Sequence, residues 1–234
     1  MRKLAPLALL IFIFSCEKET PAPAKIPPFV YTDSISDYEG HYYHTVSIGT
    51  QIWMAENLKT NHYQNGDQIT NLFSSADWSS FAVPGFCMYN NDFDAKEIYG
   101  NLYNFRAAND IRNICPVGWH IPTMTEWQTL INFSGTDAGK KLMENGTLHW
   151  FPPGNGATND FGFAALPGGW RNDQGVFENV RLHCYFWSSS NYIPFNANYP
   201  EGFTMEFDPA LTSSPAFIGH ASYFTGCAIR CIKD

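Results

Sequence analysis

The chain has 234 residues, of which 16% are aromatic and 15% are charged, and its formal net charge is −8. This acidic balance, without any cluster of basic residues, excludes the electrostatic footprint of a nucleic-acid-binding protein. Few charges combined with many aromatic residues also argue against a helical bundle and favour a loop-rich extracytoplasmic fold.

The first residues have the layout of a secretory signal. Arg2 and Lys3 form a positive start, an apolar run follows over residues 4–14, and Ser15 precedes Cys16. This order is typical of a signal peptide. The apolar run has only about half of the roughly 20 residues that a membrane-spanning helix needs. We therefore predict a signal peptide over residues 1–15.

Cys16 indicates a lipoprotein signal. Residues 13–16 read Ile-Phe-Ser-Cys and resemble the bacterial lipobox, in which a small residue precedes a cysteine that is diacylated and becomes the new N-terminus. Several acyl chains give a stable anchor, because each buried methylene contributes about 0.8 kcal/mol. We predict that Cys16 is lipidated and attaches the protein to a membrane. The alternative is an ordinary signal peptide that is cut elsewhere, with Cys16 incidental.

Residues 16–31 are predicted to form a tether. Four prolines lie within residues 21–28 and allow neither a helix nor a central strand, so the segment should extend at roughly 3 Å per residue. Glu17, Lys18 and Glu19 resemble the surface-export signal of some Gram-negative lipoproteins. Loss of Arg2 and Lys3 leaves 12 basic against 22 acidic residues, a net charge of −10. We expect an outer-membrane, lipid-anchored protein at the cell surface.

Residues 32–234 are predicted to form one α+β domain. Residues 42–48 and 51–54 indicate a hairpin around Gly49, and further strands are expected within residues 161–166, 176–177, 185–187, 202–207 and 228–232. Thr123 and Glu126 form a capping box before an amphipathic run that ends at Ser134, which predicts a helix. A weaker helix is expected near residues 101–109. Short antiparallel strands, two short helices and long loops define the class.

Several stretches, taken in order, resemble one known family. They read VSIGTQIWMAENL (46–58), YGNLYN (99–104), CPVGWHIP (115–122), EW (126–127), ALPGGWR (165–171), WSSS (187–190) and IRCIKD (229–234). This series is similar to the Fibrobacter succinogenes major paralogous domain over residues 43–234. The resemblance implies a fold related to the C-type-lectin-like and formylglycine-generating-enzyme folds. It also implies exported or surface proteins without an established activity.

The cysteines suggest a disulfide framework. Six cysteines become five once Cys16 carries lipid, so at least one thiol stays free or pairs outside the chain. In lectin-like folds a bridge commonly ties the segment of Cys115 to the final strand, and the resemblance therefore implies a Cys115–Cys231 disulfide. A second bridge, Cys184–Cys227, is plausible because both residues flank strands that should be neighbours. Cys87 would then be unpaired.

An acidic, amide-rich loop is a candidate calcium site. Calcium takes six to eight oxygen ligands, which such a loop can supply. The spacing lacks the glycine and terminal glutamate of a calcium hand, and the alternative is a solvated turn before a helix. The candidate ligands are Asn91, Asp92, Asp94 and Glu97. A second polar loop could bind a ligand or ion or be a simple turn; it contains Asn155, Asn159 and Asp160.

A cysteine pair, one histidine and the motif tryptophans could have either a chemical or a structural role. Cys227 and Cys231 resemble the copper-binding cysteine pair of formylglycine-generating enzymes, although the spacing is one residue shorter, and thiolates suit Cu(I). His120 is expected to have a core or hydrogen-bonding role. The tryptophans of the motifs are assigned to the core rather than to sugar stacking, because each lies inside a fold-defining motif: Trp53, Trp119, Trp127, Trp170 and Trp187.

The sequence contains no recognisable catalytic constellation. It has no histidine pair at metal-binding spacing, no serine elbow and no complete phosphate loop. We therefore interpret the protein as a non-catalytic surface module that binds a glycan or a protein partner. The alternatives are a structural subunit of an outer-membrane protein complex, or an oxidase of the formylglycine-generating type supported only by the cysteine pair. Calcium is the one cofactor that the sequence suggests.

Overall fold

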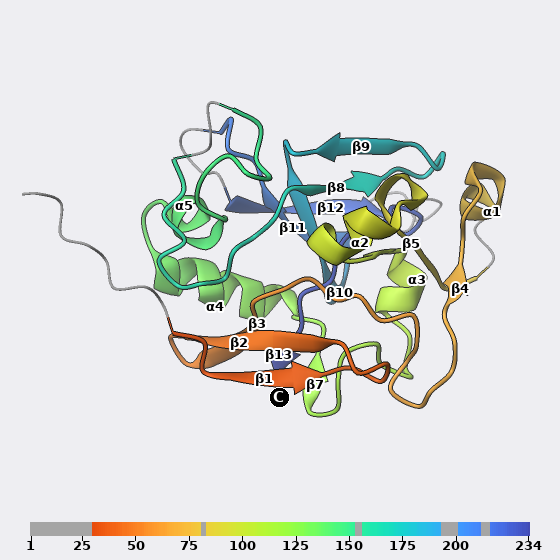
Figure 1. The fold of residues 1–234 in the computed structure, drawn as a ribbon, viewed down its shortest axis with the longest axis horizontal. Coiled ribbons are helices and arrows are strands. Elements are labelled where there is room, and N and C mark those ends of the chain that lie inside the picture. Colours follow the sequence, from red (N-terminus) through yellow and green to blue (C-terminus); the bar gives the residue numbers. More distant parts are fainter. Residues whose placement is uncertain (1–29, 81–82, 153–155, 193–200, 212–215) are drawn as a thin grey trace, which may run out of the picture.

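The structure is a computed structural model that describes residues 30–80, 83–152, 156–192, 201–211 and 216–234. The predicted signal peptide, Cys16 and nearly all of the tether lie outside these residues. The described residues form three sheets of mostly antiparallel strands joined by short helices and long loops (Figure 1). This confirms the predicted α+β class. Among the described helices, none has the length and apolar character needed to cross a bilayer.

The first sheet contains the predicted hairpin, and Figure 1 shows it along the lower edge of the molecule. Val46 pairs with Trp53, and Gly49 has a φ of 62°, which suits the tight turn because glycine has no Cβ. The C-terminal strand lies inside this sheet, since Ile232 pairs with Trp53 on one side and His120 on the other. The strand order is β1 (Asp33–Ser36), β2 (Tyr42–Ile48), β3 (Gln51–Met54), β13 (Ile232–Lys233) and β7 (Trp119–His120).

The second sheet contributes side chains to two buried hydrophobic clusters. Its order is β12 (Ala216–Ser222), β11 (Glu201–Phe207), β10 (Cys184–Tyr192), β8 (Gly168–Arg171) and β9 (Phe177–Val180). Successive side chains of a strand point to opposite faces. Tyr185 and Trp187 therefore pack into one buried cluster, and Cys184 and Phe186 pack into another. Burial on both faces explains the unbroken apolar run of residues 184–187.

The predicted capping box starts the longest described helix, α4 (Met124–Ser134). The hydroxyl of Thr123 accepts the N–H of Glu126 at 3.3 Å, and the Glu126 carboxylate accepts the N–H of Thr123 at 2.7 Å. Trp127 and Leu130 are buried on the inner face. The sequence prediction of this helix is confirmed.

The weaker predicted helix is wrong in its extent. Residues 101–109 form a short strand, β6 (Leu102–Tyr103), followed by α3 (Phe105–Ala108). Asn104 separates the two because its side chain caps α3 by accepting the N–H of Ala107 at 3.0 Å. The third sheet joins β6 to β5 (Gly85–Cys87) and β4 (Thr70–Asn71). The other helical segments are α1 (Ser75–Ser79), η1 (Tyr89–Asn91), α2 (Phe93–Tyr99) and α5 (Ala138–Leu142).

The expected strand at residues 161–166 is also corrected. This segment makes only an isolated bridge, between Ala165 and Met143, and Ala164 has a positive φ of 48°. Phe163 is nevertheless fully buried and packs edge-on against Trp53, with ring centroids 5.6 Å apart. The apolar run therefore reflects burial of a turn rather than strand pairing.

Candidate functional site

A pocket of about 380 Å³ opens beside α3, and we call it the α3 pocket. It is lined by Pro84, Phe105, Arg106, Asn109, Asp110, Ile111 and Tyr223. Binding sites for small ligands are concave, with apolar walls and a few placed polar groups. The α3 pocket combines these features.

Two stacked aromatic rings form the apolar wall of the α3 pocket. The rings of Phe105 and Tyr223 have centroids 4.3 Å apart and planes inclined by 21°. Phe105 is 1% exposed and packs edge-on against Trp187 at 5.1 Å. Its backbone N–H donates to the carbonyl of Tyr223 at 3.0 Å. Tyr223 is only half-buried, so the core holds the ring pair while part of Tyr223 remains accessible to a ligand.

Asn104 holds α3 against the rim of the pocket. Besides capping the helix, its side-chain oxygen accepts the N–H of Gly85 at 3.1 Å, and its amide donates to the carbonyl of Val83 at 3.0 Å. Asn104 is itself buried. The cap also places Phe105 inward and Arg106 outward at the first turn of the helix. The wall of the pocket is therefore positioned before any ligand arrives.

Asn109 and Arg106 are polar lining residues of the pocket, and Asn191 lies beside it in contact with two lining residues. The side-chain oxygen of Asn191 accepts the Tyr223 hydroxyl at 3.1 Å and the Asn109 amide at 3.4 Å. Arg106 is exposed, and within the described residues no carboxylate forms an ion pair with it. An aromatic ring beside amide donors and acceptors and a guanidinium can stack against a ligand and hydrogen-bond its hydroxyls or carboxylates.

The residues that line or adjoin this pocket are not predicted by any sequence pattern. Asn109 and Asn191 meet across 82 positions of the chain, and Tyr223 comes from a third segment, after β12. No spacing rule connects residues so far apart. The one local signal was Asn104, whose type suits a helix N-cap and would have indicated the start of α3.

The structure does not assemble the predicted calcium ligands. The Asp92 carboxylate caps α2 by accepting the N–H of Asp94 at 2.9 Å, and Glu97 forms an ion pair with Lys59 at 3.0 Å. The Asn91 amide donates to a backbone carbonyl at 3.1 Å. In the described part of the chain, the His, Cys, Asp and Glu side chains that gather closely enough for a metal ion do not include these residues. In the structure these side chains form a helix cap and a surface ion pair.

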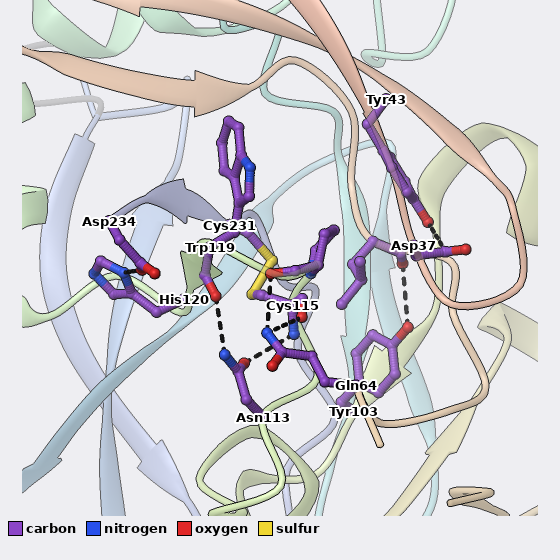
Figure 2. Close-up of a disulfide and its surroundings, with 12 residues drawn as sticks. Asp37, Tyr43, Gln64, Tyr103, Asn113, Cys115, Trp119, His120, Cys231 and Asp234 are labelled. Atoms are coloured by element: carbon purple, nitrogen blue, oxygen red, sulfur yellow. Dashed lines mark hydrogen bonds and ion pairs between the residues drawn. A yellow bond between two sulfur atoms is a disulfide. The ribbon is translucent and has the colours of Figure 1, made fainter. Parts of the chain in front are cut away.

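The predicted Cys115–Cys231 disulfide is present (Figure 2). The Cα atoms lie 6.0 Å apart, and both residues are buried. Asn113 fixes the loop around the bridge: its side-chain oxygen accepts the N–H of Cys115 at 2.9 Å, and its amide donates to the Trp119 carbonyl at 2.9 Å. Gln64 donates to the Cys115 carbonyl at 2.8 Å. The bridge ties the segment before β7 to the start of β13.

His120 forms hydrogen bonds beside this bridge, as expected from the sequence. Its Nδ1 lies 2.6 Å from Asp234, and its Nε2 lies 3.0 Å from Glu126 (Figure 2 shows the contact with Asp234). Burial alone would lower the pKa of His120, but the hydrogen bonds and charges of Asp234 and Glu126 outweigh burial and raise it. The residue thus joins β7, α4 and the C-terminus.

The second predicted bridge, Cys184–Cys227, is wrong. Both thiols are free and buried. Phe186 on β10 pairs with Ala228 in a parallel bridge, so the two segments are neighbours as expected. The side chains point to opposite faces, however, because Cys184 packs in the cluster of Phe186 and Cys227 packs in the other cluster. Two cysteines with divergent Cβ vectors cannot be bridged without backbone movement.

The free thiols are poorly suited to nucleophilic or metal chemistry. Burial raises the pKa of Cys87 to about 12, and it also raises the pKa of Cys184 and of Cys227. The thiolate is the reactive and metal-binding form. The sulfur of Cys231 lies in the disulfide, so Cys227 and Cys231 do not present two thiols side by side.

The motif tryptophans lie mainly in the core, as predicted. Trp170 is partly exposed; it stacks on Tyr185 at 4.6 Å and donates to Glu178 at 2.9 Å. The other four are buried: Trp53, Trp119, Trp127 and Trp187.

In the second polar loop, Asn155 lies outside the described residues. Asn159 accepts the N–H of Ala164 at 2.9 Å and has a positive φ of 51°. Asp160 is half-buried beside it. These features favour the interpretation of this loop as a turn.

Comparison with known proteins identifies one family. A family described as the Fibrobacter succinogenes major domain matches residues 46–233. No curated protein matches the chain, and no solved structure matches it. The matched residues include all three sheets except β1 and part of β2.

Proposed function

Because the chain belongs to the Fibrobacter succinogenes major domain family, whose name states no activity, we propose a function from the geometry of the site. The protein is a non-catalytic binding module that holds a glycan in the α3 pocket. The observation that carries this proposal is the half-buried Tyr223, stacked on Phe105 and flanked by Asn109 and Asn191. A sugar presents an apolar C–H face that can stack on an aromatic ring, and its hydroxyls can pair with the amides.

We propose that the fold is related to C-type-lectin-like and formylglycine-generating-enzyme domains. Small sheets, long connections and a disulfide from Cys115 to the last strand support this relation. Similarity of fold is a weak argument for function. The glycan proposal therefore rests on the pocket rather than on the fold.

We propose that the domain works at the outer surface of the outer membrane, anchored through lipidated Cys16. The signal-like residues 1–15 and the proline-rich tether support this localisation. Metabolic labelling with a palmitate analogue should mark the wild-type protein and not Cys16→Ser. Protease treatment of intact cells should then digest the domain, whereas full protection would contradict surface exposure.

Glycan binding is tested with the full-length protein purified in detergent. A glycan array identifies candidate ligands, and calorimetry measures their affinity for the wild type and for Tyr223→Ala and Asn109→Ala. Tyr223→Ala also removes the ring that stacks on Phe105. Asn109 is exposed, so Asn109→Ala leaves the core intact and tests the pocket independently. Tyr42→Ala is the matched control, because Tyr42 is a highly exposed tyrosine on β2. We expect both pocket variants to lose at least about tenfold in affinity, the equivalent of about 1.4 kcal/mol, and the control to bind like the wild type.

Two outcomes would overturn the glycan assignment. The first is a wild-type protein that binds no glycan on the array. The second is a bound glycan whose affinity is the same in both pocket variants. If the protein binds no glycan but one envelope protein co-purifies with it from solubilised membranes, the structural-subunit alternative takes its place.

A further inference from the structure

The short connection between β1 and β2 gathers two carboxylates and a histidine. Asp37, Glu39 and His41 each offer one possible ligand atom, and these atoms all lie within 4.8 Å of one another. Tyr38 and Gly40 separate them, so alternate residues of one tight turn project their side chains to the same side. None of these residues lines the α3 pocket. The cluster is therefore separate from the proposed glycan site.

Asp37 is held in place by donors that would orient a metal ligand. Its Oδ1 accepts the N–H groups of Glu39 and His41, both at 3.0 Å. Its Oδ2 accepts the hydroxyl of Tyr43 at 2.6 Å (Figure 2). The Nδ1 of His41 lies 2.9 Å from the same Oδ2. Ligating carboxylates are characteristically fixed by such outer hydrogen bonds.

Glu39 is fixed in the same way by the neighbouring segment. Its Oε2 accepts the hydroxyl of Thr60 at 3.1 Å and the backbone N–H of Asn61, and its Oε1 accepts the amide of Asn61 at 3.1 Å. Burial alone would raise the pKa of Glu39, but these hydrogen bonds and the nearby His62 and His41 lower it. These hydrogen bonds hold the Glu39 carboxylate against the segment of residues 60–62.

His62 supplies a second ring nitrogen to the cluster. Its Nδ1 lies 3.2 Å from the Oε1 of Glu39. That nitrogen is buried, and no described atom forms a hydrogen bond of correct geometry with it. His62 and Asp37 both line a pocket of about 160 Å³ beside the cluster. A buried nitrogen without a hydrogen bond, aimed at a carboxylate, points to a missing ligand.

We propose that Asp37, Glu39, His41 and His62 bind one zinc ion. Zinc prefers four nitrogen and oxygen ligands at about 2.0–2.2 Å in a tetrahedron. Such ligands are separated by roughly 3.3–3.6 Å, slightly more than the two histidine–carboxylate contacts here. The ion would lie between the nitrogen and oxygen atoms of these contacts. Two carboxylates balance its charge, while two imidazoles make calcium, which requires oxygen ligands, a poor fit.

The ion would connect the β1–β2 turn to the segment of residues 60–62. The Glu39 carboxylate already reaches across this boundary through its hydrogen bonds to Thr60 and Asn61. The site would be structural, because it links two segments of the chain. Zinc should therefore raise the free energy of unfolding by an amount that grows with its concentration relative to its Kd. His62, 3.2 Å from Glu39, is the proposed fourth ligand.

The test uses full-length protein in detergent, first stripped with a chelator. Calorimetry with zinc chloride should show one ion per chain, and saturating zinc should raise the Tm. Glu39→Gln and His41→Gln should weaken binding at least about 100-fold, more than the 10–100-fold typical of an outer-shell change. Tyr43→Phe, which removes only the hydroxyl on Asp37, should weaken it about 10–100-fold. Asp37 is left unchanged because it holds the turn together.

His44→Gln is the matched control. His44 pairs with Glu56 at 2.7 Å, a histidine–carboxylate contact like those of the proposed site but without a second carboxylate. Replacement of His44 should therefore leave the zinc affinity unchanged. The Tm of each variant without metal reports whether it still folds. Absence of zinc binding by the wild type overturns the site. So does binding that persists at wild-type affinity in both Glu39→Gln and His41→Gln, because the ion would then occupy other groups.

Discussion

Removal of the Cys115–Cys231 disulfide should lower the free energy of unfolding by several kcal/mol. The double variant Cys115→Ala and Cys231→Ala opens a loop with a sequence separation of 116 residues. In the chain-entropy model, closing a loop of this length restricts the unfolded chain and stabilises the fold by about 5 kcal/mol. For a domain of this size the Tm should fall by roughly 10–20 °C. The bridge also ties β13 to the segment before β7, so its loss loosens an interior strand of the first sheet, the one between β3 and β7.

Equilibrium urea unfolding, followed by tryptophan fluorescence, measures this loss. Cys184→Ala is the control, because Cys184 is an equally buried thiol that forms no bridge. Its destabilisation reports the cost of replacing one buried sulfur by a methyl group. We expect the double variant to lose about 5 kcal/mol beyond twice that control. A loss no larger than twice the control would refute the reasoning, because the bridge would then add nothing to the packing of its two side chains.

Three further predictions concern single residues. Arg230→Met should lower the free energy of unfolding by at least about 2 kcal/mol, because it leaves buried oxygens such as that of Asn57 without a donor; urea unfolding like that of the wild type would contradict this. Thr123→Ala should cost about 1 kcal/mol in the same assay through loss of the helix cap, and no loss would show that the cap is dispensable. His120→Gln should destabilise the protein more at pH 6 than at pH 9. The raised pKa of His120 means that its contribution is complete below its unfolded pKa of about 6.5 and is lost as pH rises through the folded value. An equal loss at both pH values would exclude that contribution.

Local signals in the sequence predicted the local structure well. The capping box of Thr123 and Glu126 required only neighbouring residues, and α4 begins where that box predicts. The hairpin around Gly49 required only the alternation of its strands and a turn residue. Where one residue had two roles, the prediction failed. Asn104 reads as part of a helix, yet it ends β6 and caps α3, because its amide also binds the adjacent rim of the pocket.

The cysteines show where pairing needs the tertiary structure. The family motifs indicated Cys115–Cys231, and the structure contains this bridge. For Cys184 and Cys227 the sequence correctly suggested neighbouring segments. It could not indicate on which face of the sheet each side chain lies, since a shift of one residue in register reverses every side chain of a strand.

Two buried arginines mark the same limit. Arg171 and Arg230 are almost fully buried, although arginine is mostly exposed in proteins. Arg230 lies over the ring of Phe163 at 4.5 Å, and burial lowers its pKa to about 10. Arg171 donates to the carbonyl of Leu72 at 2.6 Å. Each arginine satisfies backbone carbonyls of a distant turn, which no local pattern reveals.

The sequence by itself determined the class of the fold, the family and the main disulfide, because these depend on composition and on short motifs. The tertiary structure alone decided the two candidate sites. Asn191 meets Tyr223 and Asn109 beside the α3 pocket, and His62 meets Glu39, only after separate segments of the chain have packed together. Binding sites depend on distances in space, and in a fold with long connections those distances are set by the packing of the sheets rather than by spacing along the chain.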